Sequence, residues 1–396
     1  MDGGGLRRTL RERLARVRAR DLYRRRRRIE GAHGVRVRVD GRDCVNFCSN
    51  DYLGLAAHPA LAGAMRRAAG ELGVGSGASQ LVTGHNREHA ALEEELADYV
   101  GREAALLFAT GYAANMGTIA ALMERGDTIV SDALNHASLI DGTRLSGADK
   151  AIYAHADAAD AATRLDAAGG NRLLLTDAVF SMDGDRAPLA ALADAADERG
   201  AWLMVDDAHG FGVLGPDGAG TVPAAGLGSD RVPVLVGTLG KSLGAAGAFV
   251  AGDAELIDYL VQAARTLIFS TAPPPAVAAA AREGLRLART DAARREHLFA
   301  LLARFRRGAR ELGLPIAESD TPIQPLILGA EQAALAASDA LLARGYLVAA
   351  IRPPTVPAGT ARLRITLTAG HCEADVDGLL DALADAVAPR PAAALS

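Results

Sequence analysis

The feature that most constrains the fold is a repeated alternation of short apolar runs with helical stretches between residues 46 and 285. The strand candidates are Ala104 to Phe108, Thr128 to Val130, Arg172 to Thr176, Ala201 to Val205, Val232 to Val236 and Ala248 to Val250. Helical stretches such as Arg87 to Val100 lie between them. Strands that alternate with helices form a mostly parallel sheet covered by helices on both faces. The predicted fold class is therefore α/β.

The segments on either side of this alternation differ from it. At the amino-terminal end, an arginine-rich amphipathic helix precedes a hairpin whose turn is Asp40-Gly41. After Pro273-Pro274-Pro275, a long helical segment leads to further strands, one of them at Ile323 to Leu328. The predicted parts are an arm at 1–45, a large α/β domain at 46–285 and a smaller α+β domain at 286–396.

Charge and cysteine content argue against several classes of protein. The net charge of −5 gives no reason to expect nucleic acid or an acidic membrane as a partner. The run Arg24 to Arg28 leaves an arginine-armed nucleic-acid binder as a minor alternative, which a steep loss of affinity with salt would reveal. Three scattered cysteines are too few for a disulfide framework or a four-ligand zinc site, so no metal is expected. Without a membrane-length apolar stretch or a signal peptide, the expected location is the cytoplasm.

Lys241 lies in the glycine-rich segment Gly237 to Gly244, directly after a predicted strand. In α/β sheets, ligands bind at the carboxyl ends of strands. Burial lowers the pKa of a lysine, and a neutral amine condenses with a carbonyl group to form a Schiff base. A lysine in a glycine-rich turn is by itself more often an ordinary surface residue, so its neighbours decide the interpretation.

Asp206 and His209 follow the strand candidate that ends at Val205. A carboxylate at a strand end holds a heterocyclic nitrogen protonated, which an electron-sink cofactor requires. Alone, the two residues are explained equally well as a capping aspartate and a structural histidine. Together with Lys241 further along the chain, they indicate a site for pyridoxal 5′-phosphate (PLP).

Three weaker signals lie at other strand ends. Gly111 and Tyr112 open a helical stretch, where backbone N–H groups and the helix dipole hold a phosphate. Ser181 follows a predicted strand and would donate a hydrogen bond to a cofactor oxygen. His136 would stack on a planar ring, although lone histidines are more often structural. None of these three patterns indicates a cofactor site by itself, and each supports one only in combination with the others.

Taken together, the motifs resemble those of the α-oxoamine synthases, a fold type I PLP-dependent family. The matching segments are Asn50 to Gly54, Asn135 to Ser138, Phe180 to Asp185, Asp206 to Gly210 and Gly237 to Lys241. Their order and spacing are maintained from about residue 20 to residue 380. The resemblance implies a homodimeric acyltransferase that condenses an amino acid with an acyl thioester and releases carbon dioxide. Ile351 to Thr360 is most similar to the biotin-pathway member, which uses L-alanine and a pimeloyl thioester of CoA or of an acyl carrier protein.

The resemblance also implies which residues hold the cofactor. Lys241 would form the Schiff base, and Asp206 would pair with the pyridine nitrogen. His136 would stack on the ring and is a candidate proton donor to the thioester carbonyl. Ser181 and His209 would contact the ring and its phenolic oxygen. The phosphate would be held by the backbone of Gly111 and Tyr112 and the hydroxyl of Thr238.

For the substrates, the resemblance implies that Arg352 and Asn50 bind the amino-acid carboxylate, since the guanidinium fork suits a planar carboxylate. Arg24 and Thr355 would face the acyl substrate. Asp177 departs from the family pattern, because many relatives carry a glutamate there, and its shorter side chain leaves its role open.

Two other functions remain as alternatives within the same fold. A sister synthase would use glycine or serine with another acyl-CoA, and carbon dioxide release with each amino acid separates it from an alanine enzyme. A catalytically silent subunit would only scaffold a partner, and such a subunit is expected to lack the lysine.

Overall fold

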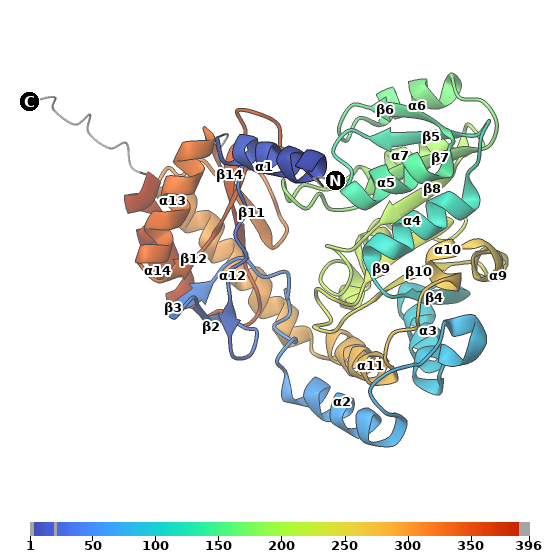
Figure 1. Ribbon diagram of the computed structural model, residues 1–396, viewed down its shortest axis with the longest axis horizontal. Coiled ribbons are helices and arrows are strands. Elements are labelled where there is room, and N and C mark those ends of the chain that lie inside the picture. Colours follow the sequence, from blue (N-terminus) through green and yellow to red (C-terminus); the bar gives the residue numbers. More distant parts are fainter. Residues whose placement is uncertain (1–3, 20–21, 388–396) are drawn as a thin grey trace, which may run out of the picture.

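The computed structural model describes residues 4–19 and 22–387. Residues 1–3 and 20–21 of the predicted arm, and residues 388–396 of the predicted small domain, lie outside this description. In the described part, the larger half of the molecule is built on a seven-stranded sheet (Figure 1). Its strands are β4 (Ala104–Phe108), β5 (Thr128–Asp132), β6 (Asp149–Tyr153), β7 (Arg172–Asp177), β8 (Trp202–Asp206), β9 (Val234–Thr238) and β10 (Ala248–Gly252).

The strand directions confirm the predicted, mostly parallel sheet. The order is β4-β10-β9-β8-β7-β5-β6. β10 pairs antiparallel with both β4 and β9, while the pairs from β9 to β6 are parallel. The sequence prediction omitted β6, because this edge strand begins with Asp149-Lys150 and exposes most of its residues, so it lacks an apolar run.

Helices cover both faces of this sheet, as predicted. One face packs against α3 (Arg87–Val100), α6 (Ala158–Asp166), α7 (Leu189–Asp197) and α11 (Pro275–Thr290). The other packs against α4 (Gly111–Leu122), α5 (Ala137–Ser146), α9 (Ala254–Ala263) and α10 (Arg265–Ile268). Because side chains alternate along a strand, β4 places Leu107 in the first core and Leu106 and Phe108 in the second.

The carboxyl-terminal half contains a separate, smaller sheet. Its strand order is β11 (Ile323–Gly329), β14 (Ala361–Thr366) and β13 (Ala349–Ile351). The helices of this half are α12 (Ala292–Glu311), α13 (Glu331–Ala343) and α14 (Glu373–Val387), which lie beside it in Figure 1. Its core includes Phe47 and Tyr52, so the first residues of the segment 46–285, which was predicted as the large domain, pack here. The predicted boundary between residues 285 and 286 lies within α11, and the three-part division stays a prediction.

The arm joins this smaller half through a second sheet with the order β1 (Ile29–Glu30), β2 (Arg36–Val39), β3 (Arg42–Asn46) and β12 (Tyr346–Leu347). The predicted hairpin is confirmed, and its turn places Asp40 at φ 48° and Gly41 at φ 81°. Positive φ at both central residues is what a two-residue hairpin turn of type I′ needs. The remaining elements are α1 (Gly4–Ala19), α2 (Pro59–Leu72), η1 (Gln80–Gly84), η2 (Pro216–Gly218) and α8 (Thr221–Ala224).

Two features of the surface bear on partners. The apolar stripe of α1 is largely exposed in this chain, with Leu6 at 71%, Leu10 at 49% and Leu14 at 46%. An amphipathic pattern of this kind predicts packing on the body of the chain or on a partner subunit, and which of the two covers the stripe stays a prediction. Within the described ranges, no helix combines the length and the apolar character that crossing a membrane requires.

Candidate active site

The carboxyl ends of five strands meet at one edge of the large sheet and carry most of the predicted residues. β4 leads to Gly111, β5 to His136, β7 to Ser181, β8 ends at Asp206 and β9 leads to Lys241. Parallel strands end at the same edge, and β4 shares their direction because β10 is antiparallel to both of its neighbours. The sheet topology therefore gathers segments that are far apart in the sequence.

Lys241 occupies the turn between β9 and β10, with its amine directed at a histidine. Its Nζ lies 2.8 Å from Nε2 of His209. Burial lowers the pKa of Lys241 to about 8, although the negative charges of Asp206 and Asp177 oppose the shift. The amine is therefore far more readily deprotonated near neutral pH than an ordinary lysine.

His209 links this amine to the first motif of the chain. Its Nδ1 lies 2.6 Å from the hydroxyl of Tyr52, which in turn donates to Oδ1 of Asn50 at 3.3 Å. Burial, then the charge of Lys241, hold the pKa of His209 well below its usual range, so the ring is neutral. One proton assignment satisfies all three bonds: Lys241 donates to Nε2, Nδ1–H donates to the Tyr52 oxygen, and Tyr52 donates to Asn50.

Asp206 is the last residue of β8, and its carboxylate is held by an amide rather than by a cation. Asn115 of α4 donates from Nδ2 to Oδ2 of Asp206 at 2.6 Å, and the backbone N–H of Ala208 donates to Oδ1 at 3.0 Å. No ion pair to Asp206 is present among residues 4–19 and 22–387. The sequence prediction missed Asn115, because an asparagine inside a helix carries no local signal of a partner on a distant strand.

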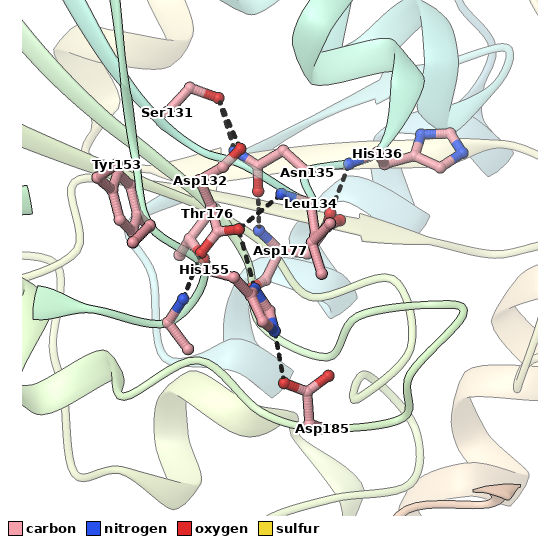
Figure 2. Close-up of polar contacts among 12 residues, drawn as sticks. Ser131, Asp132, Leu134, Asn135, His136, Tyr153, His155, Thr176, Asp177 and Asp185 are labelled. Atoms are coloured by element: carbon pink, nitrogen blue, oxygen red, sulfur yellow. Dashed lines mark hydrogen bonds and ion pairs between the residues drawn. The ribbon is translucent and has the colours of Figure 1, made fainter. Parts of the chain in front are cut away.

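His136 caps α5, and Asp177 fixes its backbone. The His136 N–H donates to Oδ2 of Asp177 at 2.6 Å (Figure 2). Nδ1 of the His136 ring lies 2.7 Å from the Ser138 hydroxyl. Burial lowers the pKa of His136. Burial, then the charge of Asp206, raise the pKa of Asp177 well above its usual value. In this chain the carboxyl of Asp177, on a shorter side chain than the glutamate of many relatives, thus accepts a hydrogen bond from the loop that carries His136.

Gly111 and Tyr112 begin α4, as predicted. Thr110 caps the helix by accepting a hydrogen bond from the N–H of Ala113. Among the described residues, no group accepts a hydrogen bond from the N–H of Gly111 or Tyr112. A side-chain carbon placed at Gly111 would meet nothing within 4 Å. An anion such as a phosphate has both donors and room here. The Thr238 hydroxyl, by contrast, already donates to the Gly247 carbonyl at 3.1 Å.

Ser181 lies close to an arginine that the sequence prediction missed. Arg364 on β14 is 6% exposed, donates from Nε to the Ser181 carbonyl at 2.5 Å and from Nη2 to Asn50 Oδ1 at 3.1 Å. Both acceptors are neutral, and no carboxylate lies within 4.0 Å of Arg364 in the described chain, whereas Arg362 pairs with Asp183. The sequence did contain one indication of a functional arginine here, because Arg362 and Arg364 lie among the mostly apolar residues of β14.

Arg24 and Arg352 lie together elsewhere, in an open hollow of about 950 Å³. Arg352 donates from Nη2 to the Tyr23 carbonyl at 3.3 Å, and Thr355 is exposed on the loop that follows Arg352. The hollow is lined by Arg18, Tyr23, Arg24, Arg25, Arg26, Leu335 and Arg352. Asn50 bonds with Arg364 and Tyr52 at the sheet edge, so the structure divides the predicted substrate residues between two places.

The functional groups at the sheet edge fit PLP. The Lys241 amine, with its lowered pKa, suits condensation with an aldehyde. The Asp206 carboxylate makes no ion pair within the described ranges and is available for a pyridinium nitrogen. Unused N–H groups at α4 match a phosphate, and the buried Oδ1 of Asn115 has no partner among the described residues. In the part of the chain that is described, no cluster of side chains suited to a metal ion occurs.

Comparisons with known proteins agree with this chemistry. Residues 42–383 match the family described as aminotransferase class I and II. An 8-amino-7-oxononanoate synthase from Pseudomonas paraeruginosa is 58% identical over 376 residues, which cover 95% of this chain and 94% of that protein. A solved serine palmitoyltransferase from S. paucimobilis, with a bound PLP–myriocin aldimine, has a TM-score of 0.91 at 29% identity and covers 98% of each chain.

A solved 8-amino-7-oxononanoate synthase from Francisella tularensis has a TM-score of 0.76 at 28% identity, covering 87% of this chain and 98% of that one. The 58% identity to the Pseudomonas enzyme extends over nearly the whole length of both chains and is about twice the identity to either solved structure. The chain belongs to the class I and II aminotransferase family and, within it, to the 8-amino-7-oxononanoate synthases, which are PLP-dependent acyltransferases.

Proposed function

We propose that this chain condenses L-alanine with a pimeloyl thioester, releases carbon dioxide and forms 8-amino-7-oxononanoate, acting as a homodimer. The observation that carries the chemistry is the amine of Lys241, with its pKa lowered to about 8 and its Nζ at 2.8 Å from His209. The choice of alanine and a pimeloyl group follows the 58% identity to the Pseudomonas enzyme.

When bound, PLP supplies an electron sink that stabilises negative charge on the α-carbon of an amino acid. Lys241 takes up and returns the α-carbon proton at Nζ, because its pKa lies close to neutral pH. Asp206 holds a proton on the pyridine nitrogen. Neutral His209, backed by Tyr52, keeps the lysine amine in place. Ser181 and the backbone N–H groups of Gly111 and Tyr112 complete the set that would hold the cofactor.

For the amino-acid carboxylate, Arg364 and Asn50 are the residues that the geometry favours. The Arg364 guanidinium is buried beside Ser181 and makes no ion pair within the described ranges. A buried charge without a partner is costly, and a substrate carboxylate would supply the missing negative charge. Arg352, predicted for this role from the resemblance, lines the arginine hollow with Arg24.

Arg364→Gln is expected to raise the KM for L-alanine by about 10- to 100-fold, which is the worth of a charge-assisted pair to a carboxylate. Arg362→Gln, on the same strand, is the matched control, because its guanidinium already pairs with Asp183. The control is expected to lower the melting temperature without raising KM. Steady-state kinetics on PLP-loaded enzyme measures both. If only Arg362→Gln raises KM, the assignment to Arg364 is wrong.

For the acyl donor, we propose that the arginine hollow attracts the negatively charged carrier of the thioester. Most of the residues that line this cavity of about 950 Å³ are arginines, although the net charge of the chain is −5. Such a concentration of positive charge raises the local concentration of an anionic partner. CoA phosphates and an acidic carrier protein both have this chemistry.

A sister synthase for another amino acid is the second candidate, favoured by the TM-score of 0.91 to serine palmitoyltransferase against 0.76 to the Francisella enzyme. A silent scaffold subunit is disfavoured, because Lys241 is present with its partners His209 and Asp206.

The deciding experiment measures carbon dioxide release by PLP-loaded enzyme with L-alanine, glycine or L-serine, each with pimeloyl-CoA, pimeloyl carrier protein or palmitoyl-CoA. L-Alanine with a pimeloyl donor is expected to have the highest kcat/KM, by at least about tenfold, since one methyl group in a fitted pocket is worth that much. A higher kcat/KM for glycine or serine would replace the alanine assignment with the sister function.

A further inference from the structure

His155 lies in the connection between β6 and α6, and each of its ring nitrogens contacts a different carboxylate. Nδ1 is 3.0 Å from Oδ1 of Asp132, and Nε2 is 2.7 Å from Oδ2 of Asp185, with the ring between them in Figure 2. Only a doubly protonated imidazole donates from both nitrogens. The hydrogen bond to Asp132, then that to Asp185, raise the pKa of His155 to about 10, so the ring is charged at neutral pH.

The Asp132 side of this bridge belongs to the loop that carries His136. Asp132 is the buried last residue of β5, and its Oδ1 also accepts the N–H of Leu134 at 2.8 Å. Its Oδ2 accepts the N–H of Ala156, whose φ of 54° is uncommon for a residue with a side chain. The Asp132 carboxylate thus contacts three groups: the strained Ala156, the ring of His155, and Leu134 at the start of the loop that carries His136.

The Asp185 side belongs to the turn that carries Ser181. The Phe180 N–H donates to the Asp185 carbonyl and the Gly184 N–H donates to the Phe180 carbonyl, which closes the turn around Ser181. The Phe180 ring meets the His155 ring edge-on, with centroids 4.3 Å apart. The other oxygen of Asp185 is buried without a partner in the described chain, so His155 is the main anchor of this carboxylate.

We propose that His155 is a positioning residue whose charged ring fixes the His136 loop and the Ser181 turn at the spacing that PLP needs. The inference rests on the proposed function, in which both His136 and Ser181 contact that cofactor. A neutral imidazole donates from only one ring nitrogen, and a glutamine amide has both of its donors on a single nitrogen, so neither spans the two carboxylates as the charged ring does. A neutral side chain at this position also leaves Asp132 and Asp185 facing each other without the cation between them, which favours separation of the two segments.

The test is titration of cofactor-free protein with PLP, followed by visible absorption and circular dichroism. His155→Gln and Asp185→Asn are each expected to raise the PLP dissociation constant at least about tenfold, as loss of one charge-assisted bond implies. Asp185 is partly exposed, so its variant probes the bridge even if His155→Gln folds poorly. The double variant is expected to bind no more weakly than either single variant, because the bridge is already broken.

His297→Gln is the matched control, since this ring on α12 donates to the His371 carbonyl, which a glutamine amide also reaches. Its PLP affinity is expected to equal that of the parent. Unchanged affinity and unchanged cofactor dichroism in His155→Gln would overturn the proposal, and so would a lowered melting temperature with unchanged affinity. If the parent binds PLP but makes no product from alanine and a pimeloyl thioester, the proposed function fails while these titrations still decide the role of His155.

Discussion

Lys241→Ala is expected to lower the rate of condensation by at least about 10⁴-fold, because in the proposed function one amine is both the attachment point of PLP and the acceptor of the α-carbon proton. The surroundings of the amine suit both roles, since burial lowers its pKa to about 8 and neutral His209 lies 2.8 Å away. Product formation from L-alanine and pimeloyl-CoA measures the loss. Borohydride reduction followed by denaturation is expected to leave PLP on the parent chain and not on the variant.

The composition of the chain makes this experiment unusually clean. The sequence contains two lysines, Lys150 and Lys241, among 43 basic residues of the lysine and arginine types. Lys150 lies on the edge strand β6 and is exposed, so Lys150→Arg is the matched control and is expected to keep full activity and full labelling. Lys241→Arg keeps the positive charge but cannot condense with an aldehyde. Activity in Lys241→Arg, or label retained by Lys241→Ala, contradicts the assignment.

The features that the sequence predicted well are those with a local cause. Apolar runs predicted the central strands, and glycines beside polar residues marked their carboxyl ends, where the topology of a parallel sheet gathers Lys241, Asp206 and Gly111. β6 was missed because an edge strand with one face in water needs no apolar run. The scarcity of lysine was a further signal: in a chain that otherwise uses arginine for positive charge, a retained lysine suggests chemistry that arginine cannot perform.

The contacts that the sequence could not reveal join residues from distant elements. Asn115 meets Asp206 across 91 positions, and Arg364 meets Asn50 across 314. Neither pair has a spacing that a helix or strand period would produce, so only the assembled fold identifies them. The resemblance placed Arg352 with Asn50, whereas the geometry places Arg364 there, on a strand of the smaller half. The roles of both arginines remain proposals, and the KM of Arg364→Gln for L-alanine tests that of Arg364.

Asp206→Asn is expected to lower the rate by about 10²- to 10³-fold, the cost of removing one preorganised electrostatic group from a buried site. The substitution keeps the shape of the side chain and a carbonyl for the Ala208 N–H, but it removes the charge that would hold a proton on the pyridine nitrogen. The amide also loses the attraction that opposes the lowered pKa of Lys241, so that pKa is expected to fall further.

Asp207→Asn is the matched control one residue away. Asp207 is buried and accepts bonds from the N–H and hydroxyl of Thr221, and burial raises its pKa to about 7. A carboxamide replaces a carboxyl that is already partly protonated, so Asp207→Asn is expected to keep the parental rate within a few-fold. Turnover with L-alanine and the absorption spectrum of bound PLP distinguish the two variants. If Asp206→Asn keeps the parental rate and Asp207→Asn is inactive, the role of binding the pyridine nitrogen belongs to Asp207 rather than to Asp206, which contacts Asn115. The proposed orientation of the cofactor at the sheet edge would then change as well.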